Sequence, residues 1–457
     1  MGARLVGHVG EVWSARRPAT RRRVIAGAGT AGAPLALGML AGCGRQGGEA
    51  QVRQSGPASI RVMHRGAPAQ QEELDLAVKL FHQRFGERKW TAEVDFHPSS
   101  AGNYNDKLLS LQAAGTLPDS FYMNAEHLSI FASRGAFYDL NAIAAKDKAT
   151  GDYWPELLEM SRYKGKLHGL PKDYSPHVIY VNEGALQAAG VPLPAPGWTW
   201  ADLLEIARRF TQRGADGAFD RLGLFGPAWY ILVWQNGGAL FDKDVRRCTL
   251  NDTAAVEALQ WQADLYTRHK VAGLSADLQA MGVQNVQQGF QNGRVALWWM
   301  GRWGVPDLRK MEGVTWDAYP LPKGKQEANV FLQSGPTVAA TTKHPDVAWE
   351  FCKAWTGPEG QSINIETGVS VPPIREPSVQ DRYLSKTPPS RRGNQVFLDA
   401  VKSGVPLPTT PNIGWGEWGP LWDPELSKVW TGEVSAKAAT DTIVPKVNAF
   451  IAEREGR

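Results

Sequence analysis

The sequence predicts an α/β fold with a parallel sheet, because short strand-like segments alternate with helical ones along its first folded stretch. Residues 59–64 form a β-like run, and residues 92–97 alternate apolar and polar side chains. Between them, residues 71–85 place apolar side chains at helical spacing and end at Gly86. Such alternation favours a parallel sheet with helices on both faces. Ligands bind these sheets at loops beyond the carboxyl ends of the strands.

The same two periodicities continue along the chain. Thr199 and Asp202 form a capping-box-like helix start, and Pro445 is expected to kink the last helix. After the N-terminal apolar run there is no second run of about 20 apolar residues, so no transmembrane helix is predicted there. The remaining predicted elements are a helix at 106–114, strands at 120–123 and 178–181, helices from Thr199 and from Asn251 or Asp252, a strand at 295–300, a helix after Pro345 and a last helix at 435–453.

The first residues are typical of an export signal. Paired arginines at 21–23 precede a small, apolar run at 26–40. The arginines resemble a twin-arginine signal, and the Leu-Ala-Gly-Cys sequence ending at Cys43 resembles the bacterial lipobox. We therefore expect residues 1–42 to be removed, Cys43 to carry lipid at the outer face of the cytoplasmic membrane, and residues 43–57 to form a flexible tether. The alternative is an ordinary secretory signal with a chance cysteine.

Charge and cysteine content exclude some partners. The formal net charge is +4, but residues 1–42 hold six arginines and one glutamate, so the rest is nearly neutral. A neutral body without a basic run argues against nucleic acid and against a polybasic membrane surface. Residues 43–457 suffice for two or three domains. Only Cys248 and Cys352 follow Cys43, and we favour free thiols over the disulfide that an exported location permits.

Catalytic and cofactor motifs are poorly represented. Residues 27–32 match GxGxxG, but they lie inside the export signal and follow arginines rather than a strand, so they do not predict a nucleotide site. The chain has no P-loop, HExxH or CxxC motif, and no Asp or Glu spacing singles out an acid/base pair. We expect no cofactor, no metal site and no enzymatic activity.

Short phrases in the body of the chain carry a family resemblance. They are YNDKL and AAGTLPD within 104–119, YKGKLHGLPKD at 163–173, GWTW at 197–200, FQNGRVAL at 290–297 and WEF at 349–351. In this order and spacing they resemble the extracellular solute-binding proteins of ABC importers, especially those that bind sugars and oligosaccharides. One departure is Met123, where many relatives carry an aromatic residue near the start of the next helix.

The resemblance implies a two-lobed periplasmic-binding-protein-like fold of type II, with a ligand cleft between lobes joined by a hinge. The first lobe is expected at 56–158 and 319–377, and the second at 159–318 and 378–457. The resemblance further implies a monomeric lipoprotein that captures a mono- or oligosaccharide by hinge closure and delivers it to the membrane permease of an ABC importer.

Tryptophan content supports a carbohydrate ligand. The chain has 18 tryptophans, several of them clustered in glycine-containing loops. A rigid aromatic ring can cover the apolar face of a pyranose while polar groups bind its hydroxyls. Trp298 and Trp299 lie on opposite faces if their strand continues, so only one should meet ligand; Trp261, Trp349 and Trp355 read as packing residues on helices. The aromatic candidates for ligand contact are Trp229, Trp299, Trp303, Trp415 and Trp418, the last two in a loop at 412–420.

Polar candidates occupy predicted loops at strand ends, where a solvent-facing role is the alternative for each. They are Arg65 after the first strand, Asn124 and Glu126 after the third, Asp173 and Tyr174 after the Gly-Leu-Pro turn, Arg302 among the tryptophans, and Ser334 and Gly335 in a later loop.

Three other functions stay open on the sequence. Arginine can bind a phosphate through paired hydrogen bonds, so Arg65 or Arg302 allows glycerol phosphate or a related polar solute in the same fold. An exported glycan hydrolase or lyase is the second, and release of product from an oligosaccharide would reveal it. A module that reports ligand to a sensor is the third.

Overall fold

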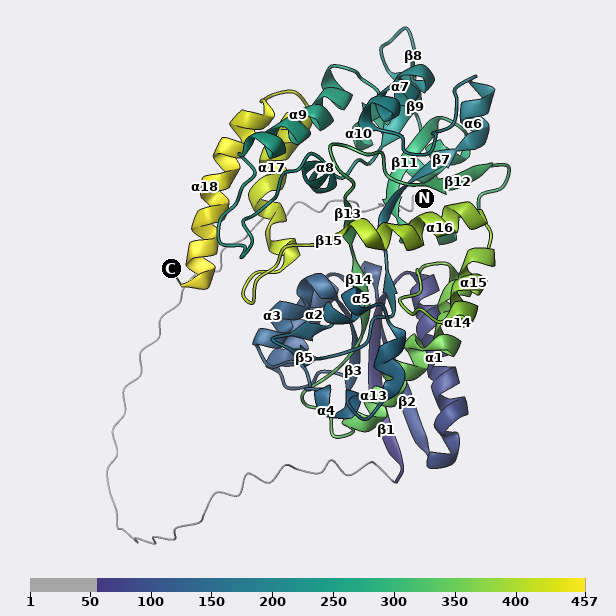
Figure 1. The fold of residues 1–457 in the computed structure, drawn as a ribbon, viewed down its shortest axis with the longest axis vertical. Coiled ribbons are helices and arrows are strands. Elements are labelled where there is room, and N and C mark those ends of the chain that lie inside the picture. Colours follow the sequence, from purple (N-terminus) through teal and green to yellow (C-terminus); the bar gives the residue numbers. More distant parts are fainter. Residues whose placement is uncertain (1–55, 457) are drawn as a thin grey trace, which may run out of the picture. The chain divides into compact units, whose positions relative to one another are not determined.

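The computed structural model describes residues 56–456. The expected export signal at 1–42, Cys43 and the tether up to residue 55 lie outside the described residues. Two larger sheets, each flanked by helices, organise the described chain (Figure 1). We call the part built on each sheet a lobe. The predicted α/β class is confirmed.

The first sheet has the strand order β2-β1-β3-β14-β6. β1 pairs in parallel with β2 and β3, as predicted. β14 comes from far along the chain and is antiparallel to both β3 and β6. The strands are β1 (Ala58–Gly66), β2 (Trp90–Pro98), β3 (Ser120–Asn124), β6 (Asp173–Tyr174) and β14 (Gln333–Val338).

Helices cover both faces of this sheet because alternate strand residues point to opposite sides. Ile60 and Val62 pack in one apolar cluster with Phe81 of α1, and Met63 packs in another with Leu108 of α2. The first-lobe elements beside the sheet are α1 (Pro68–Phe85), α2 (Tyr104–Ala113), α3 (Ala125–Ser133), α4 (Asn141–Ala144), α5 (Pro155–Glu159), α13 (Pro345–Thr356), α14 (Pro358–Thr367) and the small hairpin of β4 (Arg162–Tyr163) and β5 (Lys166–Leu167).

The second sheet has the order β10-β9-β11-β7-β12, with β8 paired to β9. β11 is parallel to β9 and antiparallel to β7, and β7 is also antiparallel to β12. The two strands predicted at 178–181 and 295–300 are its central pair. The strands are β7 (His177–Asn182), β8 (Gln212–Arg213), β9 (Phe219–Phe225), β10 (Ala272–Gly273), β11 (Val295–Gly301) and β12 (Trp316–Tyr319).

The predicted helices of the second lobe are present. The capping box of Thr199 and Asp202 starts α7, Asp252 precedes α9, and Pro445 lies inside α18. These and the other helices are α6 (Glu183–Ala188), α7 (Trp200–Phe210), α8 (Trp229–Gln235), α9 (Thr253–Thr267), α10 (Ser275–Ala280), α11 (Val286–Gln291), α12 (Val305–Leu308), α15 (Pro377–Ser385), α16 (Arg391–Asp399), α17 (Gly419–Trp430) and α18 (Ala436–Glu455). Short 3₁₀ turns lie at Gly86–Arg88, Ser99–Ala101, Lys148–Asp152, Arg302–Gly304, Ala400–Ser403 and Trp415–Glu417.

Two of the segments that carry the chain between the lobes are short and extended. Ser175 and Pro176 separate β6 from β7, and Leu332 alone separates β13 (Asn329–Phe331) from β14. The Ser175 N–H donates to the Leu332 carbonyl at 2.7 Å, which ties the two crossings together. β13 pairs in parallel with β15 (Gly404–Pro406).

The pairing of β6 differs from one of the expected lobe limits. β6 belongs to the first sheet through its pairing with β14, although residues 159–174 were expected in the second lobe. Pairing of Asp173 with Ser334 and burial of the Lys172 side chain in the first lobe account for this placement. The other lobe limits stay a prediction.

The candidates predicted in loops lie instead in ordered elements. Arg65 is in β1, Asn124 in β3, Glu126 in α3, Arg302 in a 3₁₀ turn, and Asp173 and Tyr174 form β6. Ser334 and Gly335 lie inside β14, because Gly335 lets the strand approach the backbone of Leu170 and Lys172 closely. In the expected loop at 412–420, a 3₁₀ turn at Trp415–Glu417 is followed directly by α17.

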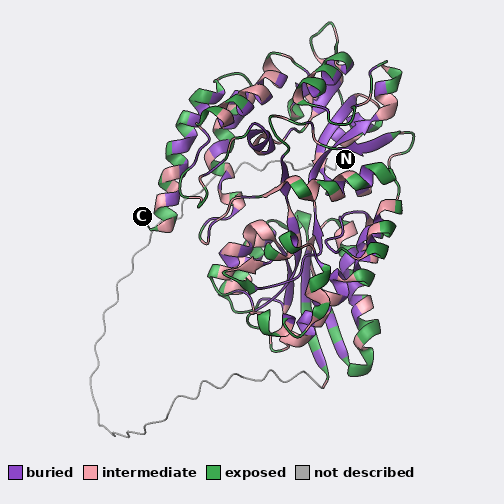
Figure 2. Ribbon diagram, viewed as in Figure 1, coloured by how far each residue is buried: buried purple, intermediate pink, exposed green. Residues whose placement is uncertain are grey.

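Burial follows the two sheets (Figure 2). Cys248 and Cys352 are both buried and free, which confirms the preferred prediction, and they belong to different apolar clusters. Within residues 56–456, no helix is both long and apolar enough to cross a membrane.

Candidate functional site

The edges of the two sheets meet where the chain crosses between lobes. β1 and β3 run in parallel, so Arg65 and Asn124 lie at the same edge, and Ser334 of β14 pairs opposite Asn124. In the second sheet, His177 begins β7 opposite Gly301 at the end of β11. Because only two residues separate β6 from β7, these two edges are neighbours. Strand-end positions of this kind are where open α/β sheets bind ligands.

Three predicted residues form one polar chain on the first lobe. Arg65 Nη2 donates to Asn124 Oδ1 at 3.0 Å, and Asn124 Nδ2 donates to Glu126 Oε1 at 2.8 Å. The Arg65 guanidinium lies 5.8 Å from the centre of the Tyr104 ring. All three side chains of this polar chain are half-buried. Together they offer donors and acceptors suited to hydroxyl groups.

Asp173 and Ser334 also meet at this edge. Ser334 Oγ donates to Asp173 Oδ1 at 2.6 Å, and the Tyr122 hydroxyl lies 2.5 Å from Ser334 Oγ. Asp173 is buried, and Ser370 and Lys172 occupy its other oxygen. The structure thus brings these two predicted residues together, but protein groups already form the hydrogen bonds and the ion pair of both Asp173 carboxylate oxygens.

A buried charged network lies beneath that pair. Lys172 Nζ is 2.7 Å from Glu73 Oε2 and 3.1 Å from Asp173 Oδ2, and the Lys172 and Glu73 side chains are fully buried. Burial opposes the charge on Lys172, but the two carboxylates outweigh it and raise the pKa of Lys172. Burial and then the Lys172 charge lower the pKa of nearby His64, so His64 is neutral.

An aromatic group lies on the second lobe, and we define it as His177, Trp229, Tyr230, Trp303 and Trp415. The Trp303 and His177 rings are 5.5 Å apart, and Tyr230 is 5.4 Å from Trp415 and 5.7 Å from Trp229, measured between ring centres. His177 and Tyr230 are 6.4 Å apart. Trp303 is 40% exposed, unlike nearly every other large apolar side chain in the described residues.

His177 and Tyr230 are the members that sequence reasoning missed. His177 directly precedes the predicted strand at 178–181, and Tyr230 directly follows Trp229. The position of His177 at a strand end is a signal that could have found it. Tyr230 lies on α8, a helix that no sequence pattern had indicated.

The polar chain and the aromatic group approach one another. Burial raises the pKa of Tyr230, and the charge of Glu126 from the other lobe adds to this effect. Beside them, Ser129 and Ser133 of α3 donate to the carbonyls of Thr410 and Pro411 at 2.9 and 2.8 Å. The segment that carries Trp415 is therefore held against the first lobe.

The other predicted site residues lie in the protein interior and contact other protein groups. Arg302 is 1% exposed, and its guanidinium donates to Asn394 Oδ1 at 2.8 Å and to the Gly368 carbonyl at 3.2 Å. Trp418 is fully buried and donates to the Pro408 carbonyl. Further predicted residues within the core are Tyr174, Trp299 and Gly335.

The two adjacent tryptophans on β11 have the predicted orientation, and both are buried. Trp298 and Trp299 point to opposite faces, as expected for consecutive strand residues, and they join different apolar clusters. Trp299 Nε1 donates to His177 Nδ1 at 3.1 Å, so its contact with the site passes through that histidine.

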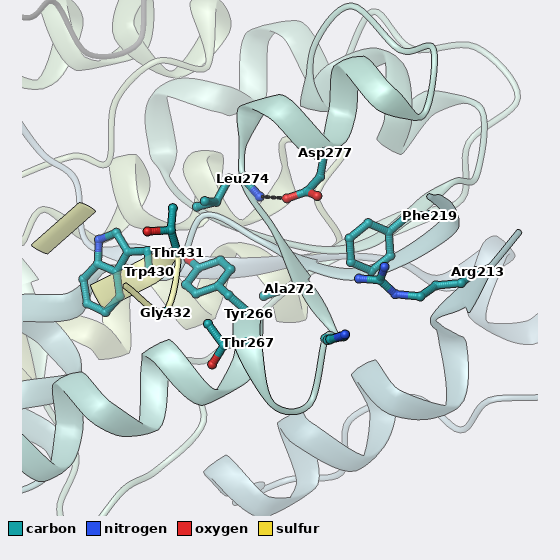
Figure 3. A pocket seen from close by; sticks show the side chains of 11 residues that line it. Arg213, Phe219, Tyr266, Thr267, Ala272, Leu274, Asp277, Trp430, Thr431 and Gly432 are labelled. Carbon is teal, nitrogen blue, oxygen red and sulfur yellow. Dashed lines mark hydrogen bonds between the residues drawn. The ribbon is translucent and has the colours of Figure 1, made fainter. Parts of the chain in front are cut away.

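A pocket lies elsewhere on the second lobe (Figure 3). This pocket of about 430 Å³ contains none of the predicted site residues. Its lining residues are Arg213, Phe219, Tyr266, Thr267, Lys270, Ala272, Leu274, Asp277, Trp430, Thr431 and Gly432. The described residues hold no cluster of three or more His, Cys, Asp or Glu side chains that could bind a metal ion.

Known proteins of similar sequence include two bacterial relatives. The chain is 25% identical over 245 residues to an uncharacterized lipoprotein of Streptomyces antibioticus, covering 51% of this chain and 52% of that protein. It is 22% identical over 342 residues to a galactooligosaccharide-binding protein of Bacillus subtilis, covering 72% and 76%. The chain therefore spans about half the length of the first relative.

Solved structures show the same two-lobed fold. An ABC substrate-binding protein from Listeria monocytogenes, in complex with cycloalternan, superposes with a TM-score of 0.76 at 24% identity over 88% of this chain and 99% of that chain. The sugar-binding protein MalE of Xanthomonas citri gives a TM-score of 0.72 at 21% identity over 87% and 98%. The family model for bacterial extracellular solute-binding proteins matches residues 69–362, more than half of the chain, and the chain belongs to this family of binding proteins.

Proposed function

We propose that this protein captures a mono- or oligosaccharide between its lobes and delivers it to the permease of an ABC importer. The observation that carries the proposal is the exposed Trp303 in the aromatic group of the second lobe, together with the half-buried polar chain of Arg65, Asn124 and Glu126 at the neighbouring edge of the first sheet. Aromatic faces suit the C–H groups of a sugar ring, and the polar chain suits its hydroxyls. Names of relatives agree, since one is a galactooligosaccharide-binding protein and another an arabinooligosaccharide-binding protein.

Binding would proceed by closure of the lobes and without covalent chemistry. Ligand that contacts both lobes stabilises the closed arrangement, because only that arrangement provides both sets of contacts. The crossings at Ser175–Pro176 and Leu332 are short and tied to each other, which suits a hinge. The closed form would then be the one that the permease recognises.

The proposed ligand contacts differ partly from the sequence candidates. We retain Arg65, Asn124, Glu126, Trp303 and Trp415, with Trp229 at the back of the aromatic group. We add His177 and Tyr230, because both contact that group. We do not retain Tyr174, Trp299, Arg302, Gly335 or Trp418 as direct contacts, because each is buried against protein. Asp173 and Ser334 would lie at the bottom of the proposed site, beneath the polar chain.

The same proposal includes a place outside the cytoplasmic membrane. The family is extracellular, and the Leu-Ala-Gly-Cys sequence supports lipid attachment at Cys43 after export. The lobes would then act as a monomer tethered to the membrane. Incorporation of a labelled fatty acid into the wild-type chain, but not into Cys43→Ala, is the expected result; equal labelling of both would contradict the anchor.

A thermal-shift panel tests the ligand class. Neutral mono- and oligosaccharides, sugar acids and glycerol phosphates are added separately to the purified protein. A ligand that binds only the folded state adds about 2.7 kcal/mol of stability at a hundred times its Kd. We expect a rise in Tm with neutral sugars. If no sugar in the panel raises the Tm, the proposal is contradicted.

Glycerol phosphate remains the second candidate, and it now rests on one residue. Arg302 is buried between the Tyr383 and Phe397 rings, so it does not reach a ligand at the sheet edges. Arg65 is half-buried there and can still donate to a phosphate. A Tm rise with phosphates alone, lost in Arg65→Gln, would favour this candidate.

A further inference from the structure

His177 is fixed in position by its backbone. Its N–H donates to Asn329 Oδ1 at 2.9 Å, and Asn329 Nδ2 donates back to the His177 carbonyl at 2.8 Å. Asn329 is itself buried at the start of β13. This pair of bonds joins His177, the first residue of β7, to β13. The backbone that carries the imidazole therefore has a fixed position at the sheet edge.

The imidazole ring is fixed as well, because Trp299 donates to one of its nitrogens. Trp299 Nε1 lies 3.1 Å from His177 Nδ1. An indole N–H can only donate a hydrogen bond, so Nδ1 must be the acceptor. A neutral imidazole then carries its single proton on Nε2. A doubly protonated ring would place two N–H groups against each other.

The environment of His177 favours that neutral form. Burial lowers the pKa of His177 to about 4. The rings that pack on His177 are those of Tyr230 and Trp303, which carry no charge at neutral pH. The imidazole is therefore neutral at pH 7, and its tautomer is set by Trp299.

The protonated nitrogen is available to a ligand. Among residues 56–456, none forms a hydrogen bond with His177 Nε2. The ring lies in the aromatic group beside the exposed Trp303, with ring planes inclined at 72°. One hydrogen-bond donor of fixed direction is thus present at the site, without positive charge.

We propose that Trp299 is a positioning residue that holds His177 as a neutral Nε2–H donor, and that this donor binds an uncharged oxygen acceptor of the sugar. The inference rests on the proposed function and names the ligand chemistry more closely. Hydroxyl, ring and glycosidic oxygens accept such a bond. A phosphate or carboxylate gains no ion pair from it, so His177 gives acidic ligands no charge-based advantage over neutral sugars.

Nitrogen NMR tests the tautomer without any ligand. In ¹⁵N-labelled protein at pH 7, Nδ1 of His177 should resonate as an unprotonated nitrogen and Nε2 as a protonated one, with the signal assigned by its loss in His177→Gln. Trp299→Phe should move both shifts toward a mixture of tautomers. Trp298→Phe is the matched control, because it removes the neighbouring indole on the opposite face and should leave both shifts unchanged. A proton on Nδ1 in the wild type would overturn the proposal.

Two substitutions of His177 test the donor. Glutamine places its amide near the position of Nε2, whereas asparagine places it near Nδ1. Titration with a neutral sugar that binds the wild type should give a Kd within about threefold in His177→Gln and at least about tenfold weaker in His177→Asn, which corresponds to roughly 1.4 kcal/mol. Equal Kd values in the wild type and both variants would overturn the role of the donor.

The outcomes separate the two claims. If no sugar binds the wild type, the proposed function fails and the donor role fails with it, whereas the NMR result still decides the tautomer. If a neutral sugar binds and both His177 variants bind it as the wild type does, the proposed function stands and this inference falls.

Discussion

His177 makes folding sensitive to acid in a defined pH window. Its pKa is about 4 in the folded chain because it is buried, against about 6.5 in the unfolded chain. Between these values the unfolded chain binds a proton that the folded chain does not, so the free energy of unfolding falls as pH drops from 6.5 to 4. The loss from His177 alone reaches about 3 kcal/mol at the lower limit.

Denaturant titration checks this contribution. The free energy of unfolding should drop less between pH 7 and pH 4.5 in His177→Gln than in the wild type, because the variant has no imidazole to protonate. The other buried histidines act equally in both proteins and cancel in the comparison. An identical drop in the two proteins would show that His177 is not buried in its neutral form.

Lys172 should be the most costly lysine to replace. It is fully buried between Glu73 and Asp173, and removing one partner leaves uncompensated buried charge. We expect Lys172→Met to lower the free energy of unfolding by about 3–5 kcal/mol. Lys437→Met is the control, because its ion pair with Asp441 is exposed and worth at most about 1 kcal/mol. Similar losses in both variants would contradict the buried network.

The sequence was enough to predict where a residue lies when its position along the chain alone places it at the edge of the sheet. Arg65 and Asn124 lie at the ends of the parallel strands β1 and β3, and Glu126 lies just after β3. Such strand ends share one edge, so the sequence suffices to place these residues together. It did not suffice for Arg302 and Trp418, because their burial depends on Asn394 and Phe241, which reach them from other parts of the chain. Whether any of these residues binds ligand stays a prediction.

At the scale of elements, β14 depends on a close backbone approach at Gly335. The Lys172 N–H donates to the Ser334 carbonyl at 2.8 Å, and the Leu170 N–H donates to the Pro336 carbonyl at 3.2 Å. A Cβ on Gly335 would overlap the Leu170 carbonyl oxygen between these bonds. The glycine predicted as a ligand-site residue is therefore required by the sheet.

Gly335→Ala should lower the free energy of unfolding by about 1–3 kcal/mol, the usual cost of overpacking. Gly151→Ala is a matched control, since a Cβ there has open space and the backbone is not in the left-handed region. Denaturant unfolding of both variants measures the difference. A Gly335→Ala protein as stable as the Gly151→Ala protein would contradict the close approach.

Elements with strong local periodicity were predictable, and elements made by distant partners were not. Strands β1, β2, β3, β7 and β11 and helices α1, α7, α13 and α18 each follow from patterns inside their own segment. β6 has only two residues and exists through its pairing with β14. α8 and α17 are rich in tryptophan and pack against one another through rings such as Trp229 and Trp422, 5.1 Å apart.

In the whole molecule, capture of a ligand between the lobes requires the lobes to move on binding. The crossings at Ser175–Pro176 and Leu332 leave few residues to absorb rotation, so closure should occur as a rigid-body hinge. Small-angle X-ray scattering should show a smaller radius of gyration when a neutral sugar saturates the protein. Binding with an unchanged scattering curve would contradict hinge closure.

We expect a neutral sugar to bind at the aromatic group of the second lobe. Isothermal titration with the sugar found in the thermal-shift panel tests it directly, using the wild type, Trp303→Ala and Trp430→Ala. Trp430 is the control, because it lines the separate pocket of the second lobe (Figure 3).

Loss of the Trp303 ring removes a stacking surface, so we expect Kd to rise about tenfold or more in Trp303→Ala and to stay at the wild-type value in Trp430→Ala. A wild-type Kd in Trp303→Ala together with lost binding in Trp430→Ala would place the ligand in the pocket lined by Trp430 and contradict binding at the aromatic group.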